Sequence, residues 1–359
     1  MERKSILSIL LVLVIIMALF TGCQPAPAEE PTEVSEETPE QPVEAAAEPA
    51  DEPYTGEPLQ IYAAYGGLEE IAQKFESETG IPVEMLSMSS GEVLSRMRAE
   101  AGRALGDVWF GGGIDSFMVA AEEGLLHPYQ SPEAISIEDR FKDQEGYWTG
   151  VSIVLVTFVV NKPLAEELGV DIPRTWESLT DPAYQGEVSM PNPGISGTAY
   201  TAIASMIQMR GEVAGWEYLD VLDQNIPYYA ERGSEPPQQA SLGEVLVGIS
   251  PDGINSLREG YPVEVVYPED GTPWWHSPVA IIEGTQNLEA AQKFVDWVLT
   301  EEGQAFLAEV SPRPSTRPNV PLPEDVPTLD ELNLVDYDFA WAAQERDRIV
   351  EEWTQRYTQ

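Results

Sequence analysis

Short apolar runs alternate with helix-like patterns through residues 58–359. Residues 59–65, 81–86 and 107–110 are typical of buried strands, and each precedes a stretch in which apolar residues recur every three or four positions. Glycines and serines separate the two kinds of stretch. This strand-turn-helix order occurs three times, so it predicts an α/β body with mostly parallel sheets and ligands at the carboxyl ends of the strands.

The run at 151–160 is almost entirely apolar and β-branched, which predicts a fully buried strand that crosses between two halves of the body. Further strands are expected at 245–249, 263–267 and 279–282. An amphipathic pattern predicts a helix at 288–299. The last fifty residues are rich in proline up to Pro327 and helical around 341–353, and we expect them to pack across the back.

The stretch 189–201 combines a strand end, two prolines and the start of a long helix. Ser196, Gly197 and Thr198 open that helix, and Ala199 begins its apolar face. The first turn of a helix has unpaired N–H groups and the positive end of the helix dipole, so it can bind an anion. An ordinary N-cap would use the same residue types. The choice between these two interpretations depends on the rest of the chain.

The N-terminus predicts export. Arg3 and Lys4 precede an apolar run at 6–20, which fits the core of a signal peptide. Cys23 follows Phe20-Thr21-Gly22 and is the only cysteine, so this segment resembles a bacterial lipobox. We therefore expect a signal peptide at 1–22 and a lipid on Cys23, with the body held outside the cytoplasm at the membrane, in the periplasm or on the cell surface. A transmembrane anchor with a chance cysteine is the alternative.

Residues 24–57 contain eleven acidic residues, seven prolines and no lysine or arginine. Such a composition cannot bury enough apolar surface to order itself, so residues 23–57 are predicted to be a disordered tether. The whole chain has a formal charge of −43, which argues against nucleic acid as a partner.

Several segments in order along the body resemble the substrate-binding proteins of bacterial ABC importers. The nearest branch of that family contains ferric-iron, sugar-phosphate and phosphonate binders. The resemblance is carried by six motifs: 75–83, 106–112, 176–179, 181–186, 192–193 with 196–201, and 294–298 with 301–304.

The resemblance implies a two-lobed periplasmic-binding-protein fold of type II. We expect lobe 1 to comprise 58–155 and 271–310, lobe 2 to comprise 156–270, and a C-terminal helical segment at 311–359 to pack on the lobes. It also implies a monomer without cofactor or catalysis, which closes on a small solute and hands it to a membrane permease.

Which solute the family resemblance implies depends on the residues at the strand ends. Three helix starts (Ser89-Ser90, Gly112-Gly113 and Ser196-Gly197-Thr198-Ala199) are expected to hold one oxyanion, next to Tyr65 and Gly66 at the end of the first strand. Asp252 and Asp270 are expected to accept from sugar hydroxyls or an amine, and Trp274 to offer a stacking face. Sugar phosphates and aminoalkylphosphonates both remain candidates.

Ferric iron is the alternative ligand. Iron binders of this branch resemble one another in a tyrosine pair after the strand that here ends at Ile249, where this chain has Ser250-Pro251-Asp252. The pair Tyr228-Tyr229 lies earlier, and we expect no metal site. A secreted hydrolase is the alternative of another class. It lacks support because neither His127 nor His276 accompanies a recognisable nucleophile motif.

Overall fold

The computed structural model describes residues 54–251 and 253–358, which belong to one compact unit beginning at Glu52. The predicted signal peptide, Cys23, most of the predicted tether and Asp252 lie outside the described residues. Within the described part, the helices are too short or too polar to cross a bilayer.

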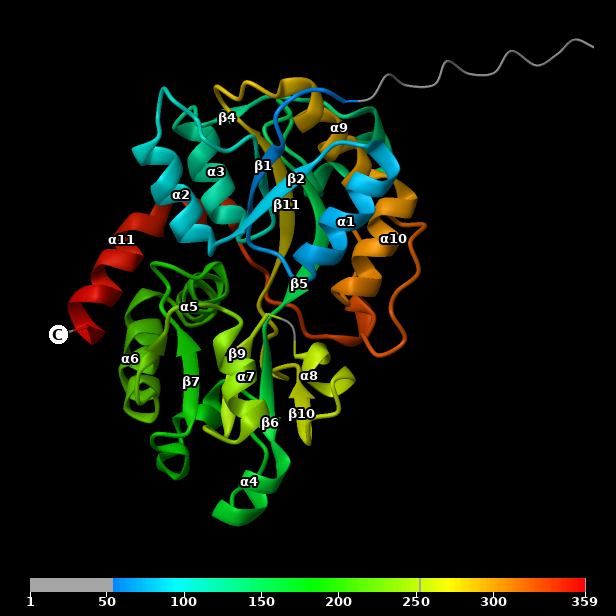
Figure 1. The fold of residues 1–359 in the computed structure, drawn as a ribbon. Coiled ribbons are helices and arrows are strands. Elements are labelled where there is room, and N and C mark those ends of the chain that lie inside the picture. Colours follow the sequence, from blue (N-terminus) through cyan, green and yellow to red (C-terminus); the bar gives the residue numbers. More distant parts are fainter. Residues whose placement is uncertain (1–53, 252, 359) are drawn as a thin grey trace, which may run out of the picture. The chain divides into compact units, whose positions relative to one another are not determined.

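Two sheets organise these residues (Figure 1). The first has the order β2-β1-β3-β11-β4, with β5 paired to β11, and comprises β1 (Leu59–Ala63), β2 (Val83–Ser87), β3 (Val108–Phe110), β4 (Leu126–His127), β5 (Thr149–Leu155) and β11 (Trp274–Ile282). The second has the order β10-β6-β9-β7-β8 and comprises β6 (Thr157–Asn161), β7 (Val188–Pro191), β8 (Tyr229–Ala230), β9 (Val247–Ser250) and β10 (Val263–Val266).

The sheets are mixed in direction, unlike the mostly parallel sheets that the sequence predicts. β1 is parallel to β2 and β3, and β7 is parallel to β8 and β9. β11 is antiparallel to β3, β4 and β5, and β6 is antiparallel to β9 and β10. The parallel parts coincide with the strand-turn-helix repeats. Of the antiparallel strands, β5 and β6 are completely buried and read as continuous apolar runs, a pattern that is typical of parallel sheets, which is why the sequence predicts the wrong direction for them.

The apolar run at 151–160 crosses between the two sheets, as predicted, but it is divided into two strands. β5 belongs to the first sheet and β6 to the second, and the division falls at Val156. The N–H of Val156 donates to the carbonyl of Pro273 at 2.8 Å, just before β11 begins. β11 then pairs with β5 over most of its length. The two crossing segments therefore lie next to each other.

Helices cover both sheets. The α-helices are α1 (Leu68–Thr79), α2 (Ser90–Ala99), α3 (Ile114–Glu122), α4 (Lys162–Leu168), α5 (Gly197–Arg210), α6 (Glu212–Leu222), α7 (Glu235–Leu242), α8 (Ile254–Arg258), α9 (Leu288–Leu299), α10 (Glu301–Val310) and α11 (Phe339–Tyr357). Short 3₁₀ helices occur at Pro132–Ser136, Asp139–Phe141, Glu177–Thr180, Pro182–Tyr184, Asp223–Asn225 and Leu329–Glu331.

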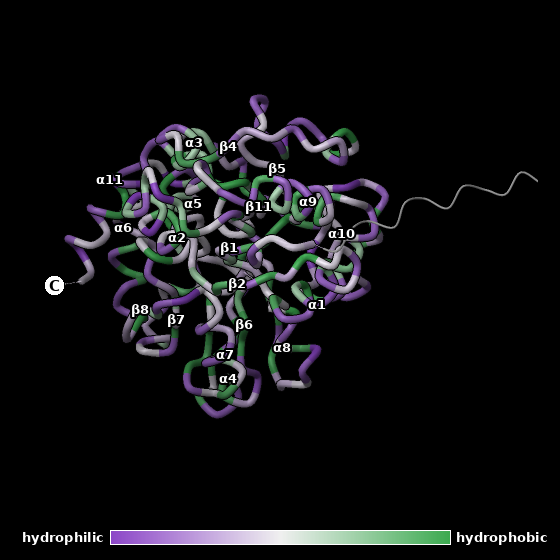
Figure 2. Tube along the Cα trace, turned by 45° about the horizontal axis from the view of Figure 1, so that its top comes forward, coloured by the Kyte–Doolittle hydropathy of each residue, from purple (hydrophilic) through white to green (hydrophobic). Residues whose placement is uncertain are grey.

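Large buried side chains fix these elements to one another. Phe75, Phe110 and Phe294 join α1 and α9 to the first sheet. A second cluster, with Trp109 and Phe158 among its members, extends from the first sheet to the second. Burying one such side chain contributes about 1.5–3 kcal/mol relative to leaving it in water. In Figure 2 the hydrophobic colour follows the strands of both sheets, and the connecting loops are mainly hydrophilic.

The C-terminal helix α11 contacts elements attached to both sheets. Arg346 of α11 pairs with Asp115 of α3 at 2.7 Å, and Arg348 pairs with Glu212 of α6 at 2.9 Å. The hydroxyl of Tyr200, in α5, donates to the carbonyl of Ala342. In Figure 1 this helix, drawn in red, runs beside α2 and α3 at one end and towards α6 at the other. It therefore ties α3 to α5 and α6.

Candidate ligand-binding site

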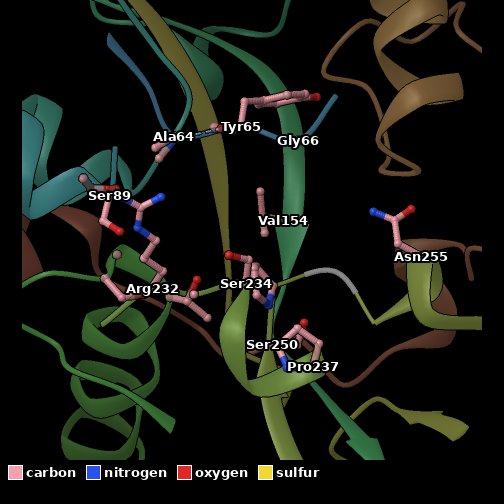
Figure 3. A pocket seen from close by; sticks show the side chains of 18 of the residues that line it. Ala64, Tyr65, Gly66, Ser89, Val154, Arg232, Ser234, Pro237, Ser250 and Asn255 are labelled. Carbon is pink, nitrogen blue, oxygen red and sulfur yellow. Dashed lines mark hydrogen bonds between the residues drawn. The ribbon is translucent and has the colours of Figure 1, made fainter. Parts of the chain in front are cut away.

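A cavity of about 450 Å³ lies where strand ends of the two sheets meet (Figure 3). Ala64-Tyr65-Gly66 after β1 and Ser250-Pro251 at the end of β9 both line it. Its size is within the range of small-molecule sites. Segments attached to both sheets thus line the same cavity.

The starts of α2 and α3 form one side of the cavity. Ser89 and Ser90 open α2, and Gly112 and Gly113 precede α3. The hydroxyl of Ser90 accepts from the N–H of Gly113 at 2.9 Å, so the two starts are joined directly. Ser277 of β11 accepts from the N–H of Gly112 at 3.1 Å. These bonds fix the loop after β3 against the neighbouring strand.

The start of α5 lies against this pair. Its first helical hydrogen bond is donated by Tyr200 to the carbonyl of Ser196 at 3.1 Å, so the N–H groups of the three residues between have no helical partner. The Ser196 side chain makes no capping bond. In the described part of the chain, the hydroxyls of Ser196 and Thr198 have no hydrogen-bond partner, and both residues line the cavity. Capping therefore does not account for these hydroxyls.

Glycines allow the three helix starts to approach one another. A Cβ atom on Gly197 would lie 3.0 Å from the nitrogen of Gly113 and 2.9 Å from the hydroxyl oxygen of Ser90. A Cβ atom on Gly91 would lie 2.2 Å from the carbonyl oxygen of Gly194, and the N–H of Gly91 donates to Ile195 at 2.9 Å. Larger residues would separate α2, α3 and α5.

The loop before α7 closes the same region. A Cβ atom on Gly233 would lie 3.1 Å from the Thr198 hydroxyl and 3.2 Å from the Ser196 hydroxyl. Arg232 is exposed and lines the cavity, and in Figure 3 its side chain extends towards Ser89. This side of the cavity therefore combines main-chain N–H groups, hydroxyls and one guanidinium, all of which suit an anion.

The remainder of the described lining is also polar and includes the first turn of the short helix α8. Asn255, Ser256, Glu259 and Tyr261 come from α8 and the turn after it, and Figure 3 shows Asn255 across the cavity from Arg232. Arg313 is buried and places its guanidinium carbon 4.6 Å from the centre of the Tyr65 ring. Amide, hydroxyl and carboxylate groups of this kind can bind hydroxyls or an amine.

Two buried ionisable groups lie behind the cavity wall. Burial lowers the pKa of His276 to about 3, because the ring lies among Phe141, Trp148 and Phe339. Burial raises the pKa of Asp115, and the guanidinium of Arg346 opposes that rise. His276 separates Trp275 and Ser277 along β11, yet its own ring does not line the cavity.

The structure brings nine of the predicted site residues together around this cavity: Tyr65, Gly66, Ser89, Ser90, Gly112, Gly113, Ser196, Gly197 and Thr198. Ala199 is buried behind them in the first turn of α5. The other described predictions lie elsewhere. Asp270 accepts from the N–H groups of Trp176 and Glu177, and the Trp274 indole donates to the carbonyl of Val335. Asp252 lies outside the described residues.

Arg232 and Arg313 also line the cavity, and neither is among the predicted site residues. The signal for Arg232 was a cation between Glu231 and Gly233, just before the prolines that open α7. Arg313 stands between two prolines. In a chain with 19 basic and 62 acidic residues, an arginine in a glycine- or proline-containing loop indicates a candidate ligand for an anion. Asn255 and Glu259 have no comparable signal in the sequence.

A family model described as bacterial extracellular solute-binding protein matches residues 110–342. A Haemophilus influenzae protein without an assigned role is 31% identical over 298 residues, which cover 80% of this chain and 86% of that relative. The chain belongs to the bacterial extracellular solute-binding proteins. Members of this family are transport proteins, and this one is the substrate-binding component of an ABC importer with the two-lobed type II fold.

Two further comparisons concern the branch. The periplasmic binding protein AfuA from Actinobacillus pleuropneumoniae, solved with exogenous fructose-6-phosphate bound, is 33% identical with a TM-score of 0.81. The match covers 84% of this chain and 98% of AfuA. Iron uptake protein A1 of Synechocystis is 25% identical over 305 residues, which cover 79% of this chain and 82% of that relative. The solute-binding protein described here therefore falls in the iron and sugar-phosphate branch.

Proposed function

We propose that this solute-binding protein captures a small phosphorylated solute, with the phosphate group at the starts of α2, α3 and α5. The observation that carries the proposal is the contact between these helix starts, together with the hydroxyls of Ser196 and Thr198 that have no partner among the described residues. Hydrogen bonds to a charged group contribute about 1.5–3 kcal/mol each, so three or four of them support micromolar binding.

The opposite end of the cavity suits the remainder of the solute, if that part carries several hydroxyl groups or an amine. Asn255 offers an amide with two donors and an acceptor, and Glu259 offers a carboxylate that accepts from hydroxyl or ammonium groups. A sugar phosphate satisfies both ends. An aminoalkylphosphonate satisfies them as well, with its amine towards Glu259. The likeness to AfuA, whose structure holds fructose-6-phosphate, supports the sugar phosphate.

Ferric iron is less well suited to this cavity. Among the described residues, its lining contains two phenols, Tyr65 and Tyr261, and one carboxylate, Glu259, alongside two arginines that would repel a trivalent cation. The tyrosine pair is engaged elsewhere, since Tyr228 accepts from Gln239 and Tyr229 donates to Asp223. The resemblance to Iron uptake protein A1 makes iron the ligand that the experiment must also test.

We further propose that the protein is a monomer anchored by a lipid on Cys23, with residues 23–57 as a tether. It carries the solute without changing it and delivers it to the permease. Lobe 1 (58–155 and 271–310) and lobe 2 (156–270) close on the solute, and the crossings near Val156 and Pro273 act as the hinge.

A ligand panel tests the proposal. The mature body, residues 24–359, is titrated calorimetrically with fructose 6-phosphate, 2-aminoethylphosphonate, inorganic phosphate, fructose and ferric citrate. We expect saturable binding of a phosphorylated compound and none of fructose, with a rise in melting temperature at concentrations well above Kd. Binding of ferric citrate alone, with a visible phenolate band, would replace the proposed ligand by iron.

A further inference from the structure

Arg232 differs from most arginines in the described part of the chain because it has no carboxylate partner. Arg98, Arg258 and Arg348 each bind a carboxylate within 3 Å. Arg232 is exposed, and its guanidinium makes no hydrogen bond or ion pair with residues 54–251 or 253–358. Although the chain has 62 acidic residues, this cation has no carboxylate partner among the described residues, and it lies at the wall of the cavity.

The backbone that carries Arg232 is held in place, although its side chain is free. The carbonyl of Arg232 accepts from the N–H of Glu235 at 3.2 Å, and a carboxylate oxygen of Glu235 accepts from the N–H of Glu231 at 3.2 Å. Gly233, the next residue, packs on the unpartnered hydroxyls of Ser196 and Thr198. The base of the Arg232 side chain is therefore positioned beside the anion-binding groups, and only its guanidinium has freedom to adjust.

We propose that Arg232 makes the cavity selective for the doubly charged form of a phosphate monoester. The proposal rests on the proposed function, because it assumes that a phosphate group occupies the starts of α2, α3 and α5. In Figure 3 the Arg232 side chain extends from the loop before α7 towards Ser89. There its guanidinium would bind two unprotonated oxygens of the phosphate group.

The selectivity follows from the kinds of hydrogen-bonding group around the phosphate. The hydroxyls of Ser196 and Thr198 can either donate or accept, so they tolerate a protonated phosphate oxygen. A guanidinium only donates and holds a full charge. It therefore binds an ionised oxygen well and a P–OH group poorly. The second pKa of a phosphate monoester is near 6, so this difference acts between pH 5 and pH 8.

The ionisable protein groups near Arg232 are mostly carboxylates. Glu231 and Glu235 flank it on its own loop, and Glu92 of α2 accepts from the N–H of Ser89. Glu259 and Arg313 line the cavity. Among the described residues, no histidine lines the cavity. Asp115, whose pKa is raised by burial, and its partner Arg346 lie behind the cavity wall in the wild type and in an Arg232 variant alike. A pH dependence of affinity that is lost when Arg232 is replaced therefore reports the ionisation of the ligand at Arg232.

The test compares calorimetric titrations of fructose 6-phosphate into four proteins at pH 5, 6, 7 and 8. The proteins are the wild type, Arg232→Gln, Arg232→Lys and the control Arg103→Gln. Arg103 is exposed, has no side-chain partner in the described part, and does not line the cavity, so its replacement makes the same change in net charge.

We expect Arg232→Gln to lower affinity at pH 8 by about 10- to 100-fold, Arg232→Lys to recover part of it, and Arg103→Gln to match the wild type. The affinity of the wild type should rise about tenfold from pH 5 to pH 8, and that rise should be nearly absent in Arg232→Gln. If the wild type binds fructose 6-phosphate and Arg232→Gln has the same affinity and pH profile, the role of Arg232 is wrong but the proposed function stands. A wild type that binds no phosphorylated compound overturns the proposed function and this inference with it.

Discussion

Nε of Arg346 lies 2.7 Å from Oδ2 of Asp115, and both side chains are almost completely buried where α11 packs on α3. Asp115 is directly behind the cavity wall, since a Cβ atom on Gly113 would lie 2.6 Å from its Oδ1. Tyr200 of α5 places its ring 5.1 Å from the Arg346 guanidinium. The ion pair thus holds together three helices, two of which begin at the cavity.

Arg346→Met should destabilise the protein by about 3–5 kcal/mol, because it leaves the Asp115 carboxylate buried without its partner. Urea unfolding at pH 7 measures this loss. The double variant Asp115→Asn/Arg346→Met removes the stranded charge and should recover much of the stability. Equal losses in the single and double variants would contradict the ion pair as the cause.

The Arg346→Met variant should also gain stability relative to the wild type as the pH falls from 7 towards 4. Loss of the guanidinium removes the interaction that opposes the raised pKa of Asp115. The folded state then takes up a proton more readily than the unfolded state, so folding is favoured as pH decreases. Unfolding curves at pH 7, 6, 5 and 4 test this; a constant difference from the wild type would be evidence against it.

His276 should make the protein less stable in acid. Burial lowers the pKa of His276 to about 3, whereas an unfolded histidine titrates near 6.5. The unfolded state therefore binds the proton first, and stability is lost as pH falls below 6.5. Between pH 7 and pH 5 this amounts to about 2 kcal/mol.

Replacing His276 with Phe tests that prediction, because the ring already lies among aromatic side chains. The variant should lose about 2 kcal/mol less than the wild type between pH 7 and pH 5. The same loss in both proteins would mean that other groups cause the acid sensitivity.

Thr198→Val should weaken binding of the phosphorylated solute about tenfold and leave the melting temperature of the free protein nearly unchanged. The Thr198 hydroxyl faces the cavity and serves no partner among the described residues, so its loss affects the ligand rather than the fold. Thr198→Ser, which keeps the hydroxyl, is the matched control. Calorimetry that finds the Val variant equal to the Ser variant would leave Thr198 without a role in binding.

Gly197→Ala should reduce binding more strongly than Thr198→Val. The added methyl group would lie about 3 Å from Gly113 and from the Ser90 hydroxyl, so α5 would have to move away from α2 and α3. Gly194→Ala serves as the control, because its methyl group would lie 3.2 Å from side-chain atoms of Asn192 and Val350, whereas that of Gly197→Ala meets main-chain atoms of Gly113. Titration of both variants with fructose 6-phosphate distinguishes them, and equal affinities would contradict the close packing.

The sequence predicts the α/β class, most strands and the helix starts well, because these depend on local patterns. Apolar runs mark the strands at 59–63 and 247–250, and Ser-Gly-Thr marks the start of α5. Strand direction and length were less accessible. Trp274 was expected to offer a stacking face to the ligand, but it is the first residue of the long strand β11. The start of this strand is set by its pairing with β5, which is a tertiary interaction that local sequence patterns do not reveal.

The role of acidic residues in turns was also difficult to predict from the sequence. Asp270-Gly271 has the pattern of a turn, and in the structure the Asp270 carboxylate accepts from two backbone N–H groups. A carboxylate that binds a ligand and one that stabilises a turn occur in the same local sequence. Only the fold distinguishes them, as it does for Arg232, whose place at the cavity depends on the packing of Gly233 on α5.

The close contact between Gly113 and Gly197 has a consequence for how such a carrier can diversify. Many of the groups it presents to an anion are main-chain amides, which among substitutions only proline removes, and the glycines that expose them tolerate little change. Asn255 and Glu259, in contrast, act through side chains that substitution alters freely. Substitutions at the Asn255 and Glu259 end of the cavity can therefore change which solute is bound, while the site for the charged group of the solute is retained.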